Sequence, residues 1–262
     1  MTIFDNRNDL SDLKRAKALL EHPGLAARLT GMLGMPIEKG FDLLPAGWHR
    51  KITDLTRAAL TKAVNTAVLT MKDAPGEAAA NTLHKLAVAA TGGIGGLFGL
   101  PALSIELPVS TTIMLRSIAD VARSEHENIR HTDTRMACIE VFALGGPDRS
   151  DDAAESGYFA VRAALAQSVS RAAEYLSAKG LAEEGAPALV RLIVQVAQRF
   201  SIQVSEKIAA QAIPAIGAVG GAAINTLFMA HFQDMARGHF IVRRLERVYG
   251  REAVERAYKE IG

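Results

Sequence analysis

The stretch TTIMLRSIADVAR runs from Thr111 to Arg123, and NTLFMAHFQDMAR runs from Asn225 to Arg237. Both contain a threonine, seven intervening residues and then Asp-x-Ala-Arg, and the two copies align without a gap. Each copy follows an apolar segment that contains glycine and proline. We predict a repeated unit in which a Gly/Pro-broken apolar helix precedes an amphipathic helix, and we expect the two units to pack together.

The repeat pairs Asp120 with Asp234 and Arg123 with Arg237. We expect the two aspartates to occupy equivalent places, where the apolar stripe of each helix ends. A chance match remains the alternative, because only four positions of the aligned stretch are shared.

The composition predicts an all-α fold, a multi-helix bundle of about ten helices. Aromatic residues make up only 5% of the 262 residues, so small aliphatic side chains dominate the apolar content. No alternating run of β-branched residues between turn pairs predicts a strand. Ser11 is the expected cap of the first helix, and further helices are expected over 48–71, from about 77, over 132–144, over 153–179, from 187, over 238–250 and over 251–260.

We predict a helical N-terminal extension over residues 1–75 and a helical domain over residues 76–262. The charged N-terminus does not resemble a signal peptide, so we expect a cytoplasmic protein that is not secreted. The single cysteine, Cys138, excludes an internal disulfide and a thiolate metal site and is interpreted as a core residue. A net charge of +2 gives no reason to expect nucleic acid as a partner. No cofactor is predicted, and the oligomeric state is left open.

Two apolar segments, residues 86–115 and 208–233, are long enough to cross a hydrocarbon core. Their weak hydrophobicity and the prolines at 101, 108 and 214 favour the buried core of a helical domain. Membrane-embedded hairpins at the inner membrane and an oligomer interface are the alternatives. Glu106 carries the only charge of the first segment and must be paired, protonated or functional. It either caps a helix that begins near Pro108 or pairs with Arg116, Lys85 or His84.

The most enzyme-like cluster is formed by His231, Asp234 and His239, at positions i, i+3 and i+8. On one helical face these side chains suit two or three metal ligands, to which Asp120, His126 or Glu106 would add another. A solvated polar stripe is the simpler interpretation. No phosphate loop, nucleophile elbow or H-E-x-x-H motif is present, so no catalytic residue is assigned.

Four arginines lie near the C-terminus, namely Arg243, Arg244, Arg247 and Arg251. Interleaved glutamates at 246, 252 and 255 predict a salt-bridged, solvated helix. A membrane-surface patch that binds lipid headgroups is the alternative.

Three blocks carry a family resemblance: residues 86–125, CIEVFALGG at 138–146 with DDAAESGYFAVRAAL at 151–165, and GAVGGAAINTLFMAHFQDMARGHFIVRRLERVYG at 217–250. Over roughly residues 80–262 the chain resembles the bacterial EcsC family. The resemblance implies no established enzymatic activity, and the family's namesake is encoded beside the subunits of an ABC transporter. We therefore expect a non-enzymatic accessory protein at or near the cytoplasmic membrane face, linked to ABC transport or envelope machinery. Its partner would be the membrane surface or a membrane-protein complex. A soluble metal-binding protein or an enzyme of unknown reaction is the alternative.

Overall fold

The computed structural model describes residues 2–21, 24–70, 100–146, 157–179, 187–213 and 217–261. Every regular element in these ranges is a helix, which confirms the all-α prediction. The predicted domain boundary at 75/76, the helix expected from residue 77 and residues 86–99 of the first apolar segment lie outside the described ranges. The division into 1–75 and 76–262 therefore stays a prediction.

The helices begin and end close to the predicted positions at most places. Their bounds are α1 Arg7–Glu21, α2 Leu25–Leu33, α3 Glu38–Phe41, α4 Trp48–Thr70, α6 Leu100–Ser124, α7 Thr132–Glu140, α8 Gly157–Lys179, α9 Pro187–Ala212, α10 Gly217–Tyr249 and α11 Arg251–Glu260, with short 3-10 turns η1 Ile3–Asp5 and η2 Val141–Ala143.

The first helix begins earlier than predicted, and Ser11 is not its cap. The Asn6 Oδ1 atom accepts hydrogen bonds from the backbone N–H of Asn8 at 3.0 Å and of Asp9 at 3.3 Å. An asparagine whose side chain satisfies two free N–H groups starts a helix at the next residue. The serine, in contrast, lies within the helix.

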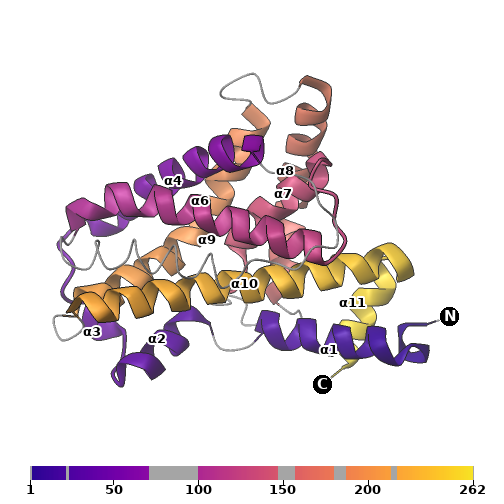
Figure 1. The fold of residues 1–262 in the computed structure, drawn as a ribbon, viewed down its shortest axis with the longest axis horizontal. Helices are drawn as coiled ribbons and strands as arrows, with labels where there is room; N and C mark the ends of the chain where they lie inside the picture. The colour runs from indigo at the N-terminus through magenta and orange to yellow at the C-terminus, as the bar shows by residue number, and fades with distance from the viewer. Residues whose placement is uncertain are drawn as a thin grey trace.

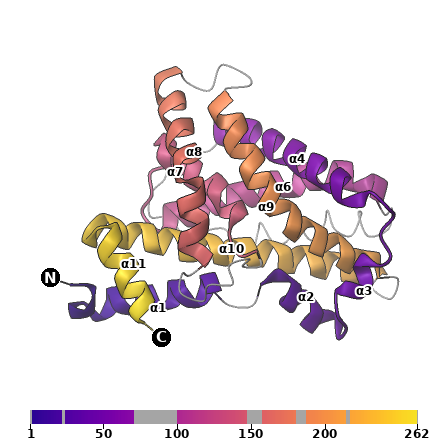
Figure 2. The same ribbon diagram turned by 180° about the vertical axis from the view of Figure 1, so that it is seen from behind.

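The longest of the described helices, α10, has 33 residues and runs along the long direction of the molecule (Figure 1). Helix α6 lies between α4 and α10, and α1 packs along the other side of α10 (Figure 1). Helix α9 packs against α4 and α8. The C-terminal part of α8 and the N-terminal part of α9 extend away from α10 (Figure 2). Helix α11 turns back beside α1, so both chain termini lie at one end of the molecule (Figure 2).

Four phenylalanines fill the space where η2, α9 and α10 meet. Phe142 lies with its ring centroid 4.8 Å from that of Phe200 and 5.4 Å from that of Phe232. Phe228 and Phe232 meet edge to face at 5.1 Å. These rings are fully buried, and tilted and edge-on contacts of this kind add to the free energy gained from burial. These four rings thus form an aromatic cluster in the core.

Pro108 does not break its helix, contrary to the prediction. Helix α6 runs without interruption through this position, with Pro101 in its first turn, where a proline is tolerated. Nearly all of the described part of segment 208–233 belongs to α9 and α10, and most of its large apolar side chains are buried in the core. Among the described helices, none combines the length and the hydropathy that a membrane crossing needs.

Candidate functional site

A buried ion pair joins α6, α9 and α10. Lys207 Nζ of α9 donates to Glu106 Oε1 of α6 at 2.5 Å, and Asn225 Nδ2 of α10 donates to the same oxygen at 3.0 Å. The side chains of Lys207 and Glu106 are 0% and 5% exposed. The ammonium also lies 5.2 Å from the centroid of the Phe228 ring. A lysine and a glutamate are tolerated in a core only when they are paired in this way.

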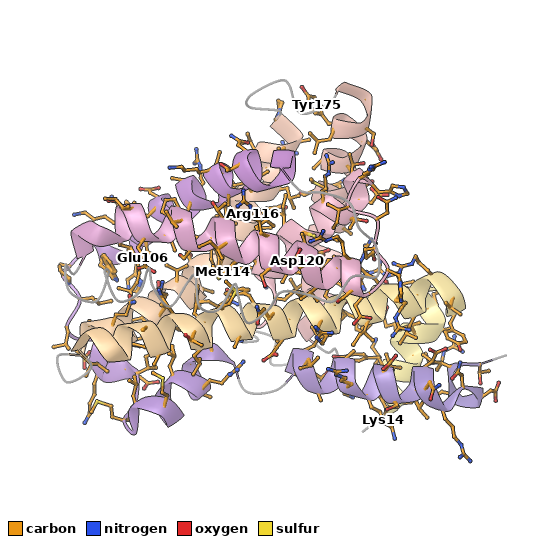
Figure 3. The ribbon with its side chains drawn as sticks, in the orientation of Figure 1. Lys14, Glu106, Met114, Arg116, Asp120 and Tyr175 are labelled. Carbon is orange, nitrogen blue, oxygen red and sulfur yellow. The ribbon has the colours of Figure 1, made fainter. Side chains whose placement is uncertain are left out.

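The partners of this carboxylate differ from those predicted. Glu106 neither caps a helix at Pro108 nor pairs with Arg116, which is exposed and lies almost three turns further along α6 (Figure 3). The other two predicted partners, His84 and Lys85, lie outside the described residues. Of the two interpretations of Glu106, the structure shows pairing and not capping, and the partners come from two distant segments of the chain.

The two repeat helices, α6 and α10, pack side by side in the same direction (Figure 1). Gln233 of α10 donates to Ser117 Oγ of α6 at 2.8 Å, and Arg237 Nη1 donates to Glu125 Oε1 at 3.4 Å. Residue numbers rise together along both helices, so aligned positions of the repeat lie close to one another across the interface. This arrangement agrees with the prediction that the two units pack together.

The repeated aspartates have different surroundings. Asp120 forms an ion pair with Arg123 one turn along its own helix. Asp234 instead binds Arg28 of α2, with 3.0 Å between Oδ2 and Nη1. Each aspartate binds an arginine, but from the same helix in one case and from a distant helix in the other. The expected equivalence therefore does not extend to their partners.

The turn after α6 is a Schellman motif built on a histidine. The backbone N–H of Glu127 donates to the carbonyl of Ala122 at 3.0 Å, and that of His126 donates to the carbonyl of Arg123 at 3.0 Å. His126 has a φ of 63°, the left-handed conformation that this motif requires and that glycine usually provides. The motif places glutamates at positions 125 and 127 beside α10.

Glu127 is the central acceptor of this region. Its carboxylate binds Arg243 Nε at 3.0 Å, Arg247 Nη1 and the hydroxyl of Thr134 of α7. Burial alone would raise the pKa of Glu127, but Arg243 and Arg247 outweigh this effect and hold the pKa below its usual range. Glu127 is therefore a carboxylate at neutral pH, and it joins α7 to α10.

Arg244 connects the same region to the N-terminal helix. Its guanidinium donates to Asp12 Oδ2 of α1 at 2.6 Å and to Glu125 Oε2 at 3.3 Å. Asp9 of α1 lies 3.8 Å from it. Ion pairs to three carboxylates from two segments hold α1 and the end of α6 against α10.

The predicted membrane-surface arginines thus bind carboxylates of the chain at three of four positions. Arg243, Arg244 and Arg247 are paired within the fold, as the salt-bridged interpretation predicts, while Arg251 is exposed in the first turn of α11. The interleaved glutamates are not their partners. Glu246 binds Arg162 of α8 through two hydrogen bonds of 2.7 and 2.9 Å.

The three predicted metal ligands of α10 face different neighbours, and the solvated polar stripe is the wrong interpretation for the two histidines, because His231 and His239 are both buried. His231 is buried beside Gly145, whose φ of 72° and lack of a side chain leave room for the imidazole ring. Burial, with a smaller contribution from Arg28, lowers the pKa of His231 to about 3. His231 is therefore neutral at physiological pH, and its Nε2 atom has no hydrogen-bond partner among the described residues.

His239 belongs to a separate buried cluster. Its Nδ1 atom lies 3.0 Å from the hydroxyl of Tyr158 of α8, and its Nε2 atom lies 3.8 Å from Glu140 Oε2 of α7. Burial, followed by Arg162 and Arg243, lowers the pKa of His239 well below its usual range. Burial also raises the pKa of Glu140 to about 7. The His239–Glu140 contact is therefore not an ion pair at neutral pH, because the imidazole is uncharged.

These positions do not assemble a metal site. Asp234 points to Arg28, while His231 and His239 lie in two separate buried environments. No group of three or more His, Cys, Asp or Glu side chains in the described ranges is arranged to hold a metal ion. Cys138 is buried, as predicted.

A family model for the EcsC protein family matches residues 7–245. The match covers most of the chain. The chain belongs to the EcsC family. Comparison with curated proteins and with solved structures finds no match.

The EcsC match begins at α1 and so includes the helices that precede the predicted domain. In the fold, α1 packs along α10, and α4 packs against α6 and α9. The arginine contacts to α1 and the buried ion pair all lie within the matched range. The EcsC match therefore extends to the N-terminal helices, where the sequence showed little resemblance.

Several residues of these clusters were not singled out in the sequence. Lys207 was visible only as the charged residue that opens the second apolar segment. Arg28, Glu125, Glu127 and Tyr158 had no distinguishing pattern. Their partners lie far along the chain, so a local pattern carries no information about the pairing.

Proposed function

We propose that this EcsC protein is a non-enzymatic accessory protein that acts at the cytoplasmic face of the membrane by binding anionic lipid. A link to ABC transport or envelope machinery is part of the proposal and rests on the family resemblance alone. The observation that carries the lipid contact is an exposed apolar stripe on α6.

The stripe begins at Ile105, which is 74% exposed, and continues one turn later at Val109, which is 42% exposed. Thr112 and Arg116 follow at the next two positions with helical spacing. Arg116 is exposed and gives the stripe a basic end. Apolar side chains followed by a basic residue on one helix face are typical of helices that lie in the headgroup region of a bilayer.

The neighbouring helix adds positive charge. Helix α4 packs against α6 and exposes four basic side chains, at Arg50, Lys51, Arg57 and Lys62. Asp54 is the only exposed acidic residue between positions 48 and 66. Basic side chains near an anionic surface contribute about 1 kcal/mol each, so the exposed lysines and arginines of α4 would add to the attraction.

Vesicle sedimentation of the full chain tests the proposal. We expect binding that increases with the fraction of phosphatidylglycerol in phosphatidylcholine vesicles and decreases with salt. The double variant Ile105→Ser/Val109→Ser should lower the fraction bound at least severalfold, because it removes the side chains that would enter the headgroup region. Val248→Ser is the matched control, since Val248 of α10 is 68% exposed but lies away from the stripe.

Equal binding of the double variant and the control would contradict the role of the stripe. No sedimentation of the unmodified chain with anionic vesicles at low salt would contradict lipid binding altogether. Circular dichroism of each variant shows whether its fold is retained. For the link to transport, recovery of transporter subunits with the tagged chain from detergent-solubilised membranes is the expected result.

A further inference from the structure

A cavity of about 310 Å³ lies where α2, α3 and α4 meet α9, far from the α6 stripe in the sequence. Its apolar wall is formed by Ala26, Ile37, Phe41 and Ile202. Its polar wall is formed by Glu38, His49, Thr53, Ser201, Ser205 and Glu206. A volume of this size is at the lower end of the range for sites that bind small molecules.

Glu206 is the unusual member of this lining. The residue is only 8% exposed, and no lysine, arginine or histidine pairs with it among the described residues. Its one partner is the backbone N–H of Ala26 in the first turn of α2. A buried carboxylate normally has a cation nearby, as Glu106 does, because an unpaired charge in a core is costly.

The three hydroxyl groups of the cavity donate their protons to backbone carbonyls. The hydroxyl of Ser201 donates to the carbonyl of Gln198 at 2.8 Å, and that of Ser205 donates to the carbonyl of Ser201 at 2.7 Å. Thr53 likewise donates to the carbonyl of His49 at 3.1 Å. Each hydroxyl proton is therefore used within its own helix, and these three hydroxyl groups offer a ligand only their oxygen lone pairs.

The charged side chains that line the cavity also favour a ligand that donates hydrogen bonds. Its lining contains two carboxyl groups, on Glu38 and Glu206, and no lysine or arginine. The aromatic ring of Phe41 and the side chain of Ile202 provide apolar surface beside these acceptors. A ligand that fits must bring hydrogen-bond donors, positive charge and a short apolar body.

We propose that this cavity binds a small organic ammonium ion, with the ammonium group on Glu206 and its alkyl part against Phe41 and Ile202. The ammonium donates to the free oxygen of the carboxylate and to the hydroxyl oxygens of Ser205 and Ser201. The Ala26 N–H occupies the other side of the carboxylate and holds it in place. The site requires neither the membrane contact nor the α6 stripe.

Binding should depend on pH in a defined direction. Burial, opposed by the Ala26 N–H, raises the pKa of Glu206 to about 7. The carboxylate form that attracts an ammonium is thus present above this pH and is lost below it. The other titratable side chains facing the cavity are Glu38 of α3 and His49 of α4, while α2 adds none.

Isothermal titration of the full chain with pentylammonium chloride tests the site. We expect saturable binding at about pH 8 that weakens by about tenfold or more near pH 6, as Glu206 takes up a proton. Pentan-1-ol, which has the same alkyl chain without the charge, should bind at least tenfold more weakly. Methylammonium should also bind more weakly than pentylammonium, because it leaves the apolar wall uncovered.

Glu206→Gln is the decisive variant. Its side-chain carbonyl can still accept from Ala26, so the cap of α2 is kept while the charge is removed. We expect this variant to lose about tenfold or more in affinity for pentylammonium and to lose the pH dependence. Glu38→Gln and His49→Gln are matched controls on the exposed rim, and both should retain the pH dependence.

Any of three results would overturn the proposal. The first is that the unmodified chain shows no saturable binding of pentylammonium at about pH 8, where the carboxylate form dominates. The second is that pentanol binds as tightly as pentylammonium, which would make the cavity merely apolar. The third is that Glu206→Gln binds like the unmodified chain, which would leave Glu206 as a helix cap alone. Circular dichroism confirms that the variants are folded, and the pH series on the unmodified chain needs no variant.

Discussion

Lys207 and Glu106 form an ion pair with 2.5 Å between Nζ and Oε1, in a part of the core where both side chains are buried. The pair joins α9 to α6, and Asn225 adds α10 to the same carboxylate oxygen. Removing the two charges from water costs free energy, and only this contact and the hydrogen bonds around it offset that cost. The pair therefore makes the relative position of three helices specific.

Replacing one partner of this pair should be strongly destabilising. Lys207→Met leaves Glu106 buried without a cation, and we expect the free energy of unfolding to fall by about 3–5 kcal/mol. The double variant Glu106→Gln/Lys207→Met should recover part of this loss, because the uncharged amide can still accept from Asn225. Urea denaturation measures both. Lys259→Met, which removes a surface pair with Glu255, is the control and should change stability little. A loss no larger than that of the control would contradict a structural role for the buried pair.

The left-handed histidine after α6 predicts a stabilising substitution. His126 has a φ of 63°, at which a side chain is strained, so His126→Gly should raise the free energy of unfolding by about 0.5–1 kcal/mol. Ser124→Gly, two residues earlier in ordinary helical conformation, should not raise it, because glycine there only adds flexibility to the unfolded chain. Thermal denaturation of the two variants compares them directly. If both behaved alike, the Schellman motif would not be controlling the turn.

Helix α3 approaches α9 so closely that only glycine fits between them. A Cβ atom at Gly40 would lie 2.1 Å from the carbonyl oxygen of Ala209, which is backbone and cannot move aside. Gly40→Ala should therefore lower stability by about 1–3 kcal/mol or more. Gly31 of α2 has no atom within 4 Å of such a Cβ, so Gly31→Ala should stabilise by about 0.5–1 kcal/mol through its helix propensity. Opposite signs for the two variants in denaturant unfolding are the expected result.

The buried imidazole of His231 predicts how stability depends on pH. Its pKa of about 3 in the fold lies below the ordinary value of 6.5, so between these values the unfolded chain binds a proton that the folded chain does not. Stability contributed by the neutral ring is thus present above about pH 6.5 and is lost as pH falls toward 3.

Removing this imidazole should flatten the pH profile. The free energy of unfolding of the unmodified chain should fall more steeply than that of His231→Gln, by up to about 1.4 kcal/mol per pH unit within this window. His49→Gln, which removes an imidazole at an exposed position, is the matched control. Parallel profiles for His231→Gln and the unmodified chain, from urea denaturation at several pH values, would mean that His231 is not held neutral.

The helical class, most helix ends and the close packing of the two repeat helices were predicted from the sequence. Helix periodicity, small apolar residues and the turn at Gly145 are local signals. They depend only on residues close together in the sequence, so they can be recognised without knowing the tertiary structure. Two local expectations still failed. Asn6 replaced Ser11 as a cap, and Pro108 was accommodated inside α6, because competing caps and a packed helix face can override a single-residue rule.

What the sequence by itself determined is that Glu106, the one charge of an apolar segment, must be paired, protonated or functional. The sequence did not show that His231 and His239 are buried. What only the tertiary structure decided is which charged side chains pair with one another. Lys207 binds Glu106, Glu127 binds Arg243 and Arg247, and Glu206 faces a cavity without a cation of its own. The physical reason is that burial makes an unpaired charge costly wherever it stands in the chain, whereas only the packing of distant helices determines which opposite charge comes within reach.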